Sequence, residues 1–158
     1  IGVWGSSAGG QLVSLLGLAG PDAGFDTGQY ADRSSRVDAV VDMFGPSDLL
    51  QFGDSSGFAR FLLWAGLGTS PDVRRRLSPI GYVHRGAPPF LIVQGRQDSD
   101  VLSTQSTTFA RRLRAAGVPA TLVLVSGTGH SMATPGQQPT PEQVTDRVLE
   151  FFRRTLAA

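Results

Sequence analysis

The start of the sequence joins a strand to a helix through a short turn of small residues. Ile1–Trp4 is apolar enough for a buried strand, and Gln11–Ala19 is a second apolar stretch that ends before a Gly-Pro stop signal. Between them lies only Gly5–Gly10, which consists of glycine, serine and alanine. Small residues leave the space for such a sharp turn. A strand that runs directly into a helix favours an α/β domain with a parallel sheet.

The turn contains the pattern Gly-x-Ser-x-Gly, which is in register only around Ser7. Gly5 and Gly9 lie two residues to either side of it, whereas Ser6 has no glycine at these offsets. Between a strand and a helix this pattern is typical of a nucleophile elbow, whose strained turn exposes the serine hydroxyl. We therefore predict that Ser7 is a nucleophile and that both glycines keep side chains out of a crowded space. The Ala8 backbone N–H is the predicted oxyanion donor.

Composition removes several other kinds of site. All 14 basic residues are arginine, so a P-loop lysine is missing, and the turn lacks the third glycine of a Rossmann phosphate loop. There is no cysteine and there are only two, widely separated histidines, so we expect no metal and no cofactor. A formal charge of +1 gives no reason to expect nucleic acid, and no apolar run reaches the ~18 residues of a membrane span. A purely structural glycine-serine turn remains the alternative to the elbow.

The remaining apolar segments predict a three-layer α/β fold. Short runs rich in branched residues suit parallel strands that are covered on both faces. Longer stretches with apolar residues at helical spacing lie between and after them, and the last begins with a capping-box pattern. The predicted strands are Val37–Phe44, Phe90–Val93 and Thr121–Val125, and the predicted helices are Ser103–Ala116 and a final one carrying Val144, Val148, Phe152 and Leu156. We expect a single domain over residues 1–158, with a mainly parallel sheet flanked by helices.

Residues 49–76 form too long a segment for a simple connection. They include several aromatic and leucine residues, among them Phe52, Phe58, Phe61 and Trp64. One interpretation is a small helical excursion that caps one end of the sheet. The other is an ordinary core helix, and the sequence does not decide between them.

A serine nucleophile needs a base and a carboxylate that orients the base, in the chain order Ser, Asp or Glu, His. Asp98 follows the third predicted strand and His130 follows the fourth, so both belong at the carboxyl ends of parallel strands, where sites collect. We predict Ser7, Asp98 and His130 as the catalytic residues. Rival acids are Asp100 and Asp48, and a solvent-facing loop is the alternative for the histidine. His84 precedes a strand and is interpreted as a surface or packing residue.

Taken together, these segments resemble the C-terminal half of an α/β-hydrolase of the acetyl-esterase/lipase type, which includes carboxylesterases and feruloyl-esterase-like proteins. GSSAGG is similar to the elbow, FGPSDL to the segment after the next strand, APPFLIVQGRQDSDV to the acid loop and VSGTGHSM to the histidine loop. Two positions depart from the family pattern. Gln94 stands where the acid loop usually has histidine, and Leu102 stands where proline is common.

The resemblance implies a serine ester hydrolase that acts on small-molecule esters with short acyl or aryl groups. A prolyl-oligopeptidase-type peptidase domain shares the elbow and is an alternative, and a catalytically dead, truncated hydrolase is another. Family members carry further strands before the elbow and a His-Gly-Gly loop with oxyanion donors, and we expect both to be missing here. Losing one donor costs about 10²–10³ in rate, so we expect the isolated chain to be nearly inactive. An unpaired Ile1–Trp4 strand also makes a homodimer possible. The compartment is not indicated.

Overall fold

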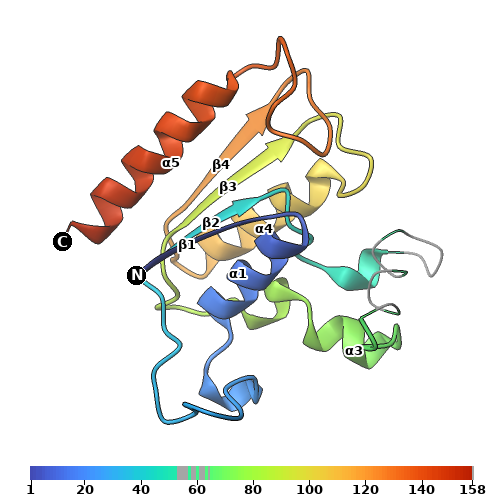
Figure 1. Ribbon diagram of the computed structural model, residues 1–158, viewed down its shortest axis with the longest axis vertical. Coiled ribbons are helices and arrows are strands. Elements are labelled where there is room, and N and C mark those ends of the chain that lie inside the picture. The colour runs from blue at the N-terminus through green and yellow to red at the C-terminus, as the bar shows by residue number, and fades with distance from the viewer. Residues whose placement is uncertain (53–56, 58–59, 61–62, 64, 158) are drawn as a thin grey trace.

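The computed structural model describes residues 1–52, 57, 60, 63 and 65–157 (Figure 1). Its sheet has four strands in the order β1-β2-β3-β4, and every neighbouring pair is parallel. Because all four strands run the same way, the segments that follow them gather at one edge of the sheet. The strands are β1 (Gly2–Ser6), β2 (Ala39–Met43), β3 (Phe90–Gly95) and β4 (Ala120–Val125).

The helices cover the sheet on both faces, which confirms the predicted three layers. Helices α1 (Ala8–Leu18) and α4 (Ser103–Ala115) lie on one face, and α5 (Pro141–Leu156) lies on the other (Figure 1). Among the residues that the structure describes, the other elements with given bounds are a short helix and three 3₁₀ turns. They are α3 (Pro71–Arg76), η1 (Pro21–Ala23), η2 (Leu49–Gln51) and η3 (Pro79–Tyr82).

The two central strands are buried along their whole length, as expected for parallel strands between two helical layers. Alternate residues point to opposite faces. Val40 and Ile92 pack with the α1 and α4 side chains, whereas Val41 and Val93 pack with those of α5. The continuous apolar runs in the sequence therefore supply two separate cores, one on each side of the sheet.

The predicted elements are present, with shifts at their ends. Strand β1 continues to Ser6 and α1 begins at Ala8, so the turn between them consists of one residue rather than six. The capping box of α5 is confirmed. The Gln143 N–H donates to Thr140 Oγ1 at 3.3 Å, and the Thr140 N–H donates to Gln143 Oε1 at 3.0 Å.

Some expectations are not tested by this structure. Phe58, Phe61 and Trp64 lie outside the described residues, so the helical excursion at residues 49–76 stays a prediction. Strand β1 is an edge strand, and its pairing with a second copy likewise stays a prediction. Within the described ranges, no helix combines the length and apolar character needed to cross a bilayer.

Candidate active site

Ser7 is the single residue of the turn between β1 and α1, and its backbone is strained. Its φ is 53° and its ψ is −122°, a region that residues with a side chain rarely adopt. The Ser7 N–H donates to the Met43 carbonyl at 2.9 Å, which anchors the turn to the end of β2. Strain of this kind persists only where the surroundings hold it, and it places the serine hydroxyl at the carboxyl edge of the sheet.

The two glycines that flank this serine have different roles, which corrects the sequence interpretation. A side chain at Gly5 would collide with the Gly9 carbonyl group, because β1 and α1 nearly touch there. A side chain at Gly9 would meet nothing within 4 Å. The second crowded glycine is instead Gly10, whose missing side chain leaves room for the Asp42 carboxylate. Only the first glycine of the pattern is therefore required by space within the described chain.

The three predicted catalytic residues meet at the carboxyl ends of three strands. His130 Nε2 lies 2.7 Å from Ser7 Oγ, and His130 Nδ1 lies 2.8 Å from Asp98 Oδ2. A carboxylate can only accept, so Nδ1 carries the proton, and the Ser7 hydroxyl donates to Nε2. The Asp98 side chain is fully buried, whereas that of His130 is 22% exposed. This is the arrangement in which an imidazole can take the proton of an attacking hydroxyl.

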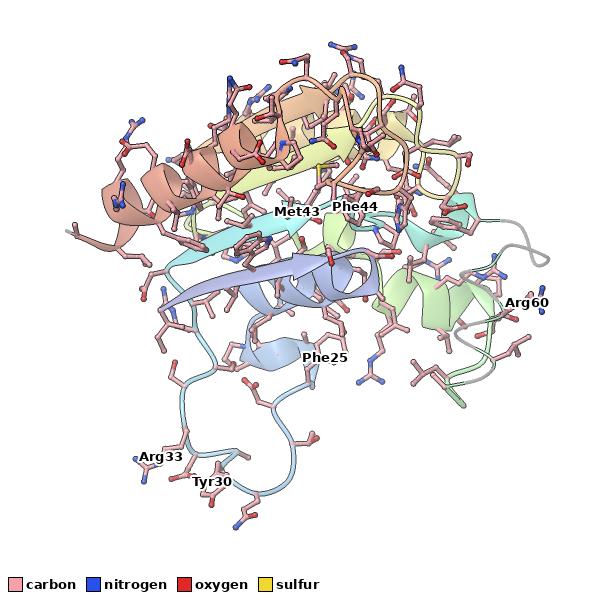
Figure 2. The ribbon with its side chains drawn as sticks, turned by 45° about the horizontal axis from the view of Figure 1, so that its top comes forward. Phe25, Tyr30, Arg33, Met43, Phe44 and Arg60 are labelled. Carbon is pink, nitrogen blue, oxygen red and sulfur yellow. The ribbon has the colours of Figure 1, made fainter. Side chains whose placement is uncertain are left out.

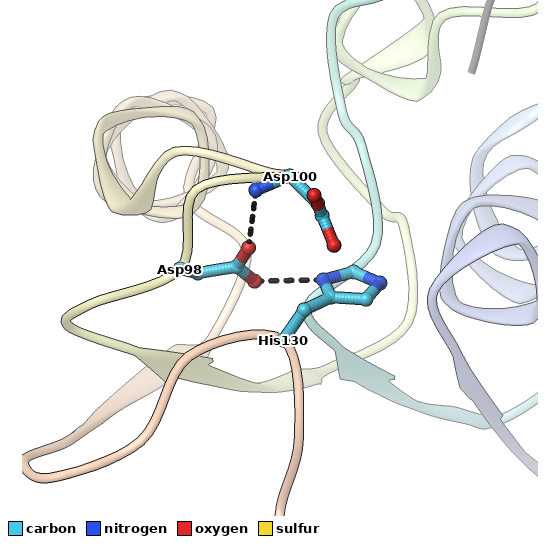
Figure 3. A group of neighbouring side chains, drawn as sticks. All are labelled: Asp98, Asp100 and His130. Carbon is cyan, nitrogen blue, oxygen red and sulfur yellow. Dashed lines mark hydrogen bonds and ion pairs between the residues drawn. The ribbon is translucent and has the colours of Figure 1, made fainter. Parts of the chain in front are cut away.

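The Asp98 carboxylate has every acceptor position occupied. Its Oδ1 accepts the backbone N–H groups of Asp100 and Val101, each at 2.9 Å. Its Oδ2 accepts from His130 Nδ1 and from Gln94 Nε2, each at 2.8 Å. Figure 3 shows Asp98, Asp100 and His130 together. Each offers one possible metal-ligand atom, and these atoms lie within 4.8 Å of one another. Because both oxygens of Asp98 are already engaged twice, a metal ion here would have to displace hydrogen bonds.

The rival residues lie elsewhere or face differently. Asp48 caps η2, where its carboxylate accepts from the Leu50 N–H at 3.1 Å. Asp100 is exposed and meets Asp98 through its backbone rather than through its carboxylate. His84 is exposed and its ring contacts the Arg85 carbonyl at 2.8 Å. The carboxylate that is hydrogen-bonded to the imidazole is therefore that of Asp98, the acid that the sequence favoured.

The acid loop and the histidine loop are held against each other. A side chain at Gly95 would collide with the Gly129 carbonyl, so this glycine permits the close approach. Gln97 then joins the two loops. Its N–H donates to the Thr128 carbonyl at 3.1 Å, and its Oε1 accepts from the Gly127 N–H at 3.0 Å. These contacts bring together residues that are about thirty positions apart, and they hold the loop of Asp98 close to the loop of His130.

Phe44, at the end of β2, packs against the imidazole. The two ring centroids are 4.6 Å apart at an angle of 64°, an edge-to-face contact. Phe44 has a φ of 45°, which is rare for a bulky residue, and its N–H donates to the Val93 carbonyl at 2.8 Å. Figure 2 labels it beside Met43. From the sequence, Phe44 is only the expected end of a strand, and nothing there connects it with His130.

Asp42 is a buried carboxyl group beneath the elbow. It is 1% exposed, its Oδ2 accepts from Ser14 Oγ at 3.0 Å, and its Oδ1 accepts from the Gly45 N–H at 2.9 Å. Burial raises the pKa of Asp42 from 3.8 to about 7, against the opposing effect of these two hydrogen bonds. In the sequence, Asp42 is noticeable only as an acidic residue within an apolar predicted strand.

The Ala8 N–H lies at the start of α1, directly after Ser7. The first N–H groups of a helix have no partner within it, and the helix dipole adds a partial positive charge there. Such a group can hydrogen-bond a developing oxyanion, and the role of Ala8 as an oxyanion donor stays a prediction.

Comparisons with known proteins show the family of this chain. The sequence pattern of the BD-FAE family matches residues 1–113. The chain belongs to the BD-FAE family. The matched region contains Ser7 and Asp98 and ends before His130, so the predicted base of this BD-FAE chain lies beyond the match.

Curated relatives of this BD-FAE chain are named as esterases. It is 36% identical over 121 residues to esterase LipC of Mycobacterium tuberculosis, and 31% identical over 122 residues to esterase LipQ of the same organism. The alignments cover 73% and 74% of this chain but 30% and 29% of the relatives. The chain therefore spans less than a third of the length of the curated relatives it matches.

Solved structures share the α/β-hydrolase fold. A truncated carbohydrate esterase from gut microbiota has 29% identity and a TM-score of 0.73, with 95% of this chain and 59% of that chain covered. An esterase from Thermogutta terrifontis has 22% identity and a TM-score of 0.77, with 98% and 54% covered, and it shows the fold alone. The fold predicted for this BD-FAE chain is thus confirmed.

Proposed function

We propose that the protein is a serine ester hydrolase that works through an acyl-enzyme. The observation that carries this proposal is the continuous hydrogen-bonded line from Ser7 Oγ through the His130 imidazole to Asp98, with distances of 2.7 and 2.8 Å. A hydroxyl is a weak nucleophile on its own, and an imidazole held in the right tautomer activates it. Membership of a family whose named relatives are esterases supports an ester as the substrate.

In the first half of the reaction, Ser7 Oγ attacks the ester carbonyl carbon while His130 Nε2 takes the hydroxyl proton. The imidazolium is stabilised by the buried Asp98 carboxylate. The carbonyl oxygen becomes an oxyanion next to the Ala8 N–H. Collapse of this intermediate expels the alcohol, which receives the proton from His130 and leaves an ester of Ser7 with the acyl group.

In the second half, a water molecule takes the place of the alcohol. His130 removes a proton from the water as it attacks the acyl carbon, and it returns that proton to Ser7 Oγ when the acid leaves. The steps of both halves use the side chains of Ser7, His130 and Asp98, the Ala8 backbone N–H and water. We propose short acyl or aryl esters as substrates because the residues around the nucleophile are glycine, alanine and serine.

The test is active-site labelling and ester hydrolysis in the whole protein, with a matched pair of serine variants. We expect a fluorophosphonate probe to label Ser7, and Ser7→Ala to lose labelling and to lower p-nitrophenyl acetate hydrolysis by at least ~10³-fold. Ser6→Ala is the control, because this exposed neighbour lies outside the hydrogen-bonded line. Wild-type hydrolysis by Ser7→Ala contradicts the proposal.

The same experiment separates the alternatives. A dead hydrolase is indicated if the wild-type protein is neither labelled nor active. A peptidase is indicated if a prolyl p-nitroanilide is cleaved faster than the acetate ester, and the esterase relatives named above give that alternative no support.

A further inference from the structure

A buried glutamine lies behind the catalytic acid. Gln94 is on β3 and is 0% exposed. Its Nε2 donates to Asp98 Oδ2 at 2.8 Å and to the Val101 carbonyl at 3.1 Å. Its Oε1 accepts from Ser106 Oγ at 2.7 Å. A buried amide costs free energy unless its polar atoms are paired, and here both ends are paired.

The amide donates to the same carboxylate oxygen that accepts from the imidazole. Asp98 Oδ2 therefore receives Gln94 Nε2 from one side and His130 Nδ1 from the other. Because Oδ1 is held by two backbone N–H groups, rotation of the carboxylate would break four hydrogen bonds. Gln94 thus supplies the only side-chain donor, besides the imidazole, among the described contacts of Asp98.

Ser106 determines which way the amide points. It lies on α4, is 2% exposed and donates to Gln94 Oε1. Flipping the amide would place Oε1 against the Asp98 carboxylate, so two acceptors would face each other. The serine hydroxyl and the carboxylate therefore select the same amide orientation from opposite ends.

We propose that Gln94 is a positioning residue for Asp98, oriented in turn by Ser106, so that the catalytic line runs from α4 to the nucleophile through five side chains. This inference rests on the proposed serine hydrolase function. It adds two residues to that mechanism, both of which act through Asp98 and neither of which touches the substrate. An amide does not titrate, so its donation to Asp98 persists at every pH at which the fold is stable.

The first test is Gln94→Met in the whole protein, a change of similar volume that removes the donor. We expect kcat for p-nitrophenyl acetate to fall about tenfold to a hundredfold with KM within about threefold, because a misoriented base slows chemistry rather than binding. Gln11→Met is the matched control. Gln11 is also buried, but its amide donates to the Leu77 carbonyl at 2.7 Å, so this variant loses thermal stability while kcat stays within about twofold.

A double-mutant cycle tests the link to α4. Ser106→Ala alone lowers kcat by a smaller factor than Gln94→Met, because the amide keeps its contact with Asp98 but loses its orientation. In the Gln94→Met background the same serine change has no further effect on kcat, since there is no amide left to orient. Independent, multiplicative effects on kcat would overturn the proposed line.

Gln94→Glu is the second variant if the methionine protein does not fold. It keeps the shape, and its protonated form can still donate to Asp98, whereas its ionised form repels that carboxylate. Asp98, Asp100 and His130 are the other ionisable groups near this position, and the variant and the wild type both contain them. The ratio of variant to wild-type kcat therefore falls as the pH rises, and a constant ratio contradicts the proposal.

The two proposals fail in different ways. If Ser7→Ala is inactive while Gln94→Met and Gln94→Glu both retain wild-type kcat at every pH, only the positioning role is wrong. If Ser7→Ala hydrolyses the ester normally, the serine mechanism itself is wrong.

Discussion

Replacing the buried Asp42 with asparagine changes how the stability of this protein depends on pH. Asp42 is 1% exposed, and burial raises its pKa from 3.8 to about 7. The folded state therefore holds a proton that the unfolded chain has released between these two values. By linkage, unfolding free energy falls as the pH rises through this window, because the folded state binds more protons. The contribution of protonated Asp42 to the unfolding free energy is fully present below pH ~4 and is lost above pH ~7.

The size of the effect follows from the shift. About three pKa units at 1.36 kcal/mol each give a total of roughly 4 kcal/mol, of which about 2 kcal/mol falls between pH 5 and pH 7. The asparagine that replaces Asp42 has no such proton equilibrium. Its side-chain oxygen accepts the Gly45 N–H, and its NH₂ group donates to the Ser14 hydroxyl, so both present contacts have a counterpart. The unfolding free energy of the variant therefore increases relative to that of the wild type as the pH rises.

Urea unfolding of both proteins between pH 5 and pH 8 is the assay, with equal m values required for the comparison. We expect the unfolding free energy of Asp42→Asn minus that of the wild type to increase by about 2 kcal/mol from pH 5 to pH 7. Ser14→Ala removes a donor that favours the charged form of Asp42, so the pKa of Asp42 rises further. In this variant the unfolding free energy should therefore fall at a higher pH than in the wild type. Parallel curves for Asp42→Asn and wild type, or a difference of opposite sign, would refute the reasoning.

Three other predictions concern the site and the last helix. Asp98→Asn should lower kcat in steady-state assays by at least ~10²-fold, because the Asp98 carboxylate holds the imidazole. Asp100→Asn should change kcat by less than about fivefold, and equal losses in the two variants would contradict this. Gly5→Ala should unfold the elbow and abolish fluorophosphonate labelling. Gly9→Ala should raise the unfolding free energy, measured by thermal denaturation, by about 0.5–1 kcal/mol through helix propensity. A destabilised Gly9→Ala protein would show that the open space next to Gly9 is filled. Thr140→Ala should cost about 1 kcal/mol of stability by removing the helix cap, and an unchanged melting temperature would argue against it.

Much of the fold was predictable from local patterns. The small-residue turn, the branched apolar runs and the capping box at Thr140 each depend on neighbours within a few positions, so they can be read along the chain. The order of these elements then requires a parallel sheet, and a parallel sheet brings the residues after its strands to one edge. That reasoning was enough to predict Ser7 and His130, and to favour Asp98 over two rival acids.

Contacts between distant segments were decided only by the tertiary structure. The sequence left Asp98, Asp100 and Asp48 open as acids, and the choice depends on which loop lies within hydrogen-bond distance of the imidazole. Gly9 appeared to be required by the pattern, but the crowding falls on Gly5 and Gly10, because Gly5 lies against the Gly9 backbone and Gly10 lies against the Asp42 carboxylate.

The roles of the residues around the proposed catalytic line were likewise not predictable from the sequence. Gln94 read as a departure from the family pattern, yet its amide meets Asp98 in the folded chain. Phe44 ended a strand in the sequence, yet its ring contacts His130, which lies far along the chain. Hydrogen bonds and ring contacts depend on distances of a few ångströms between side chains from different elements, and no periodicity along one chain contains that information. The sequence by itself determined which residues could react, and the packing of α4, β2 and β3 decided what holds them in place.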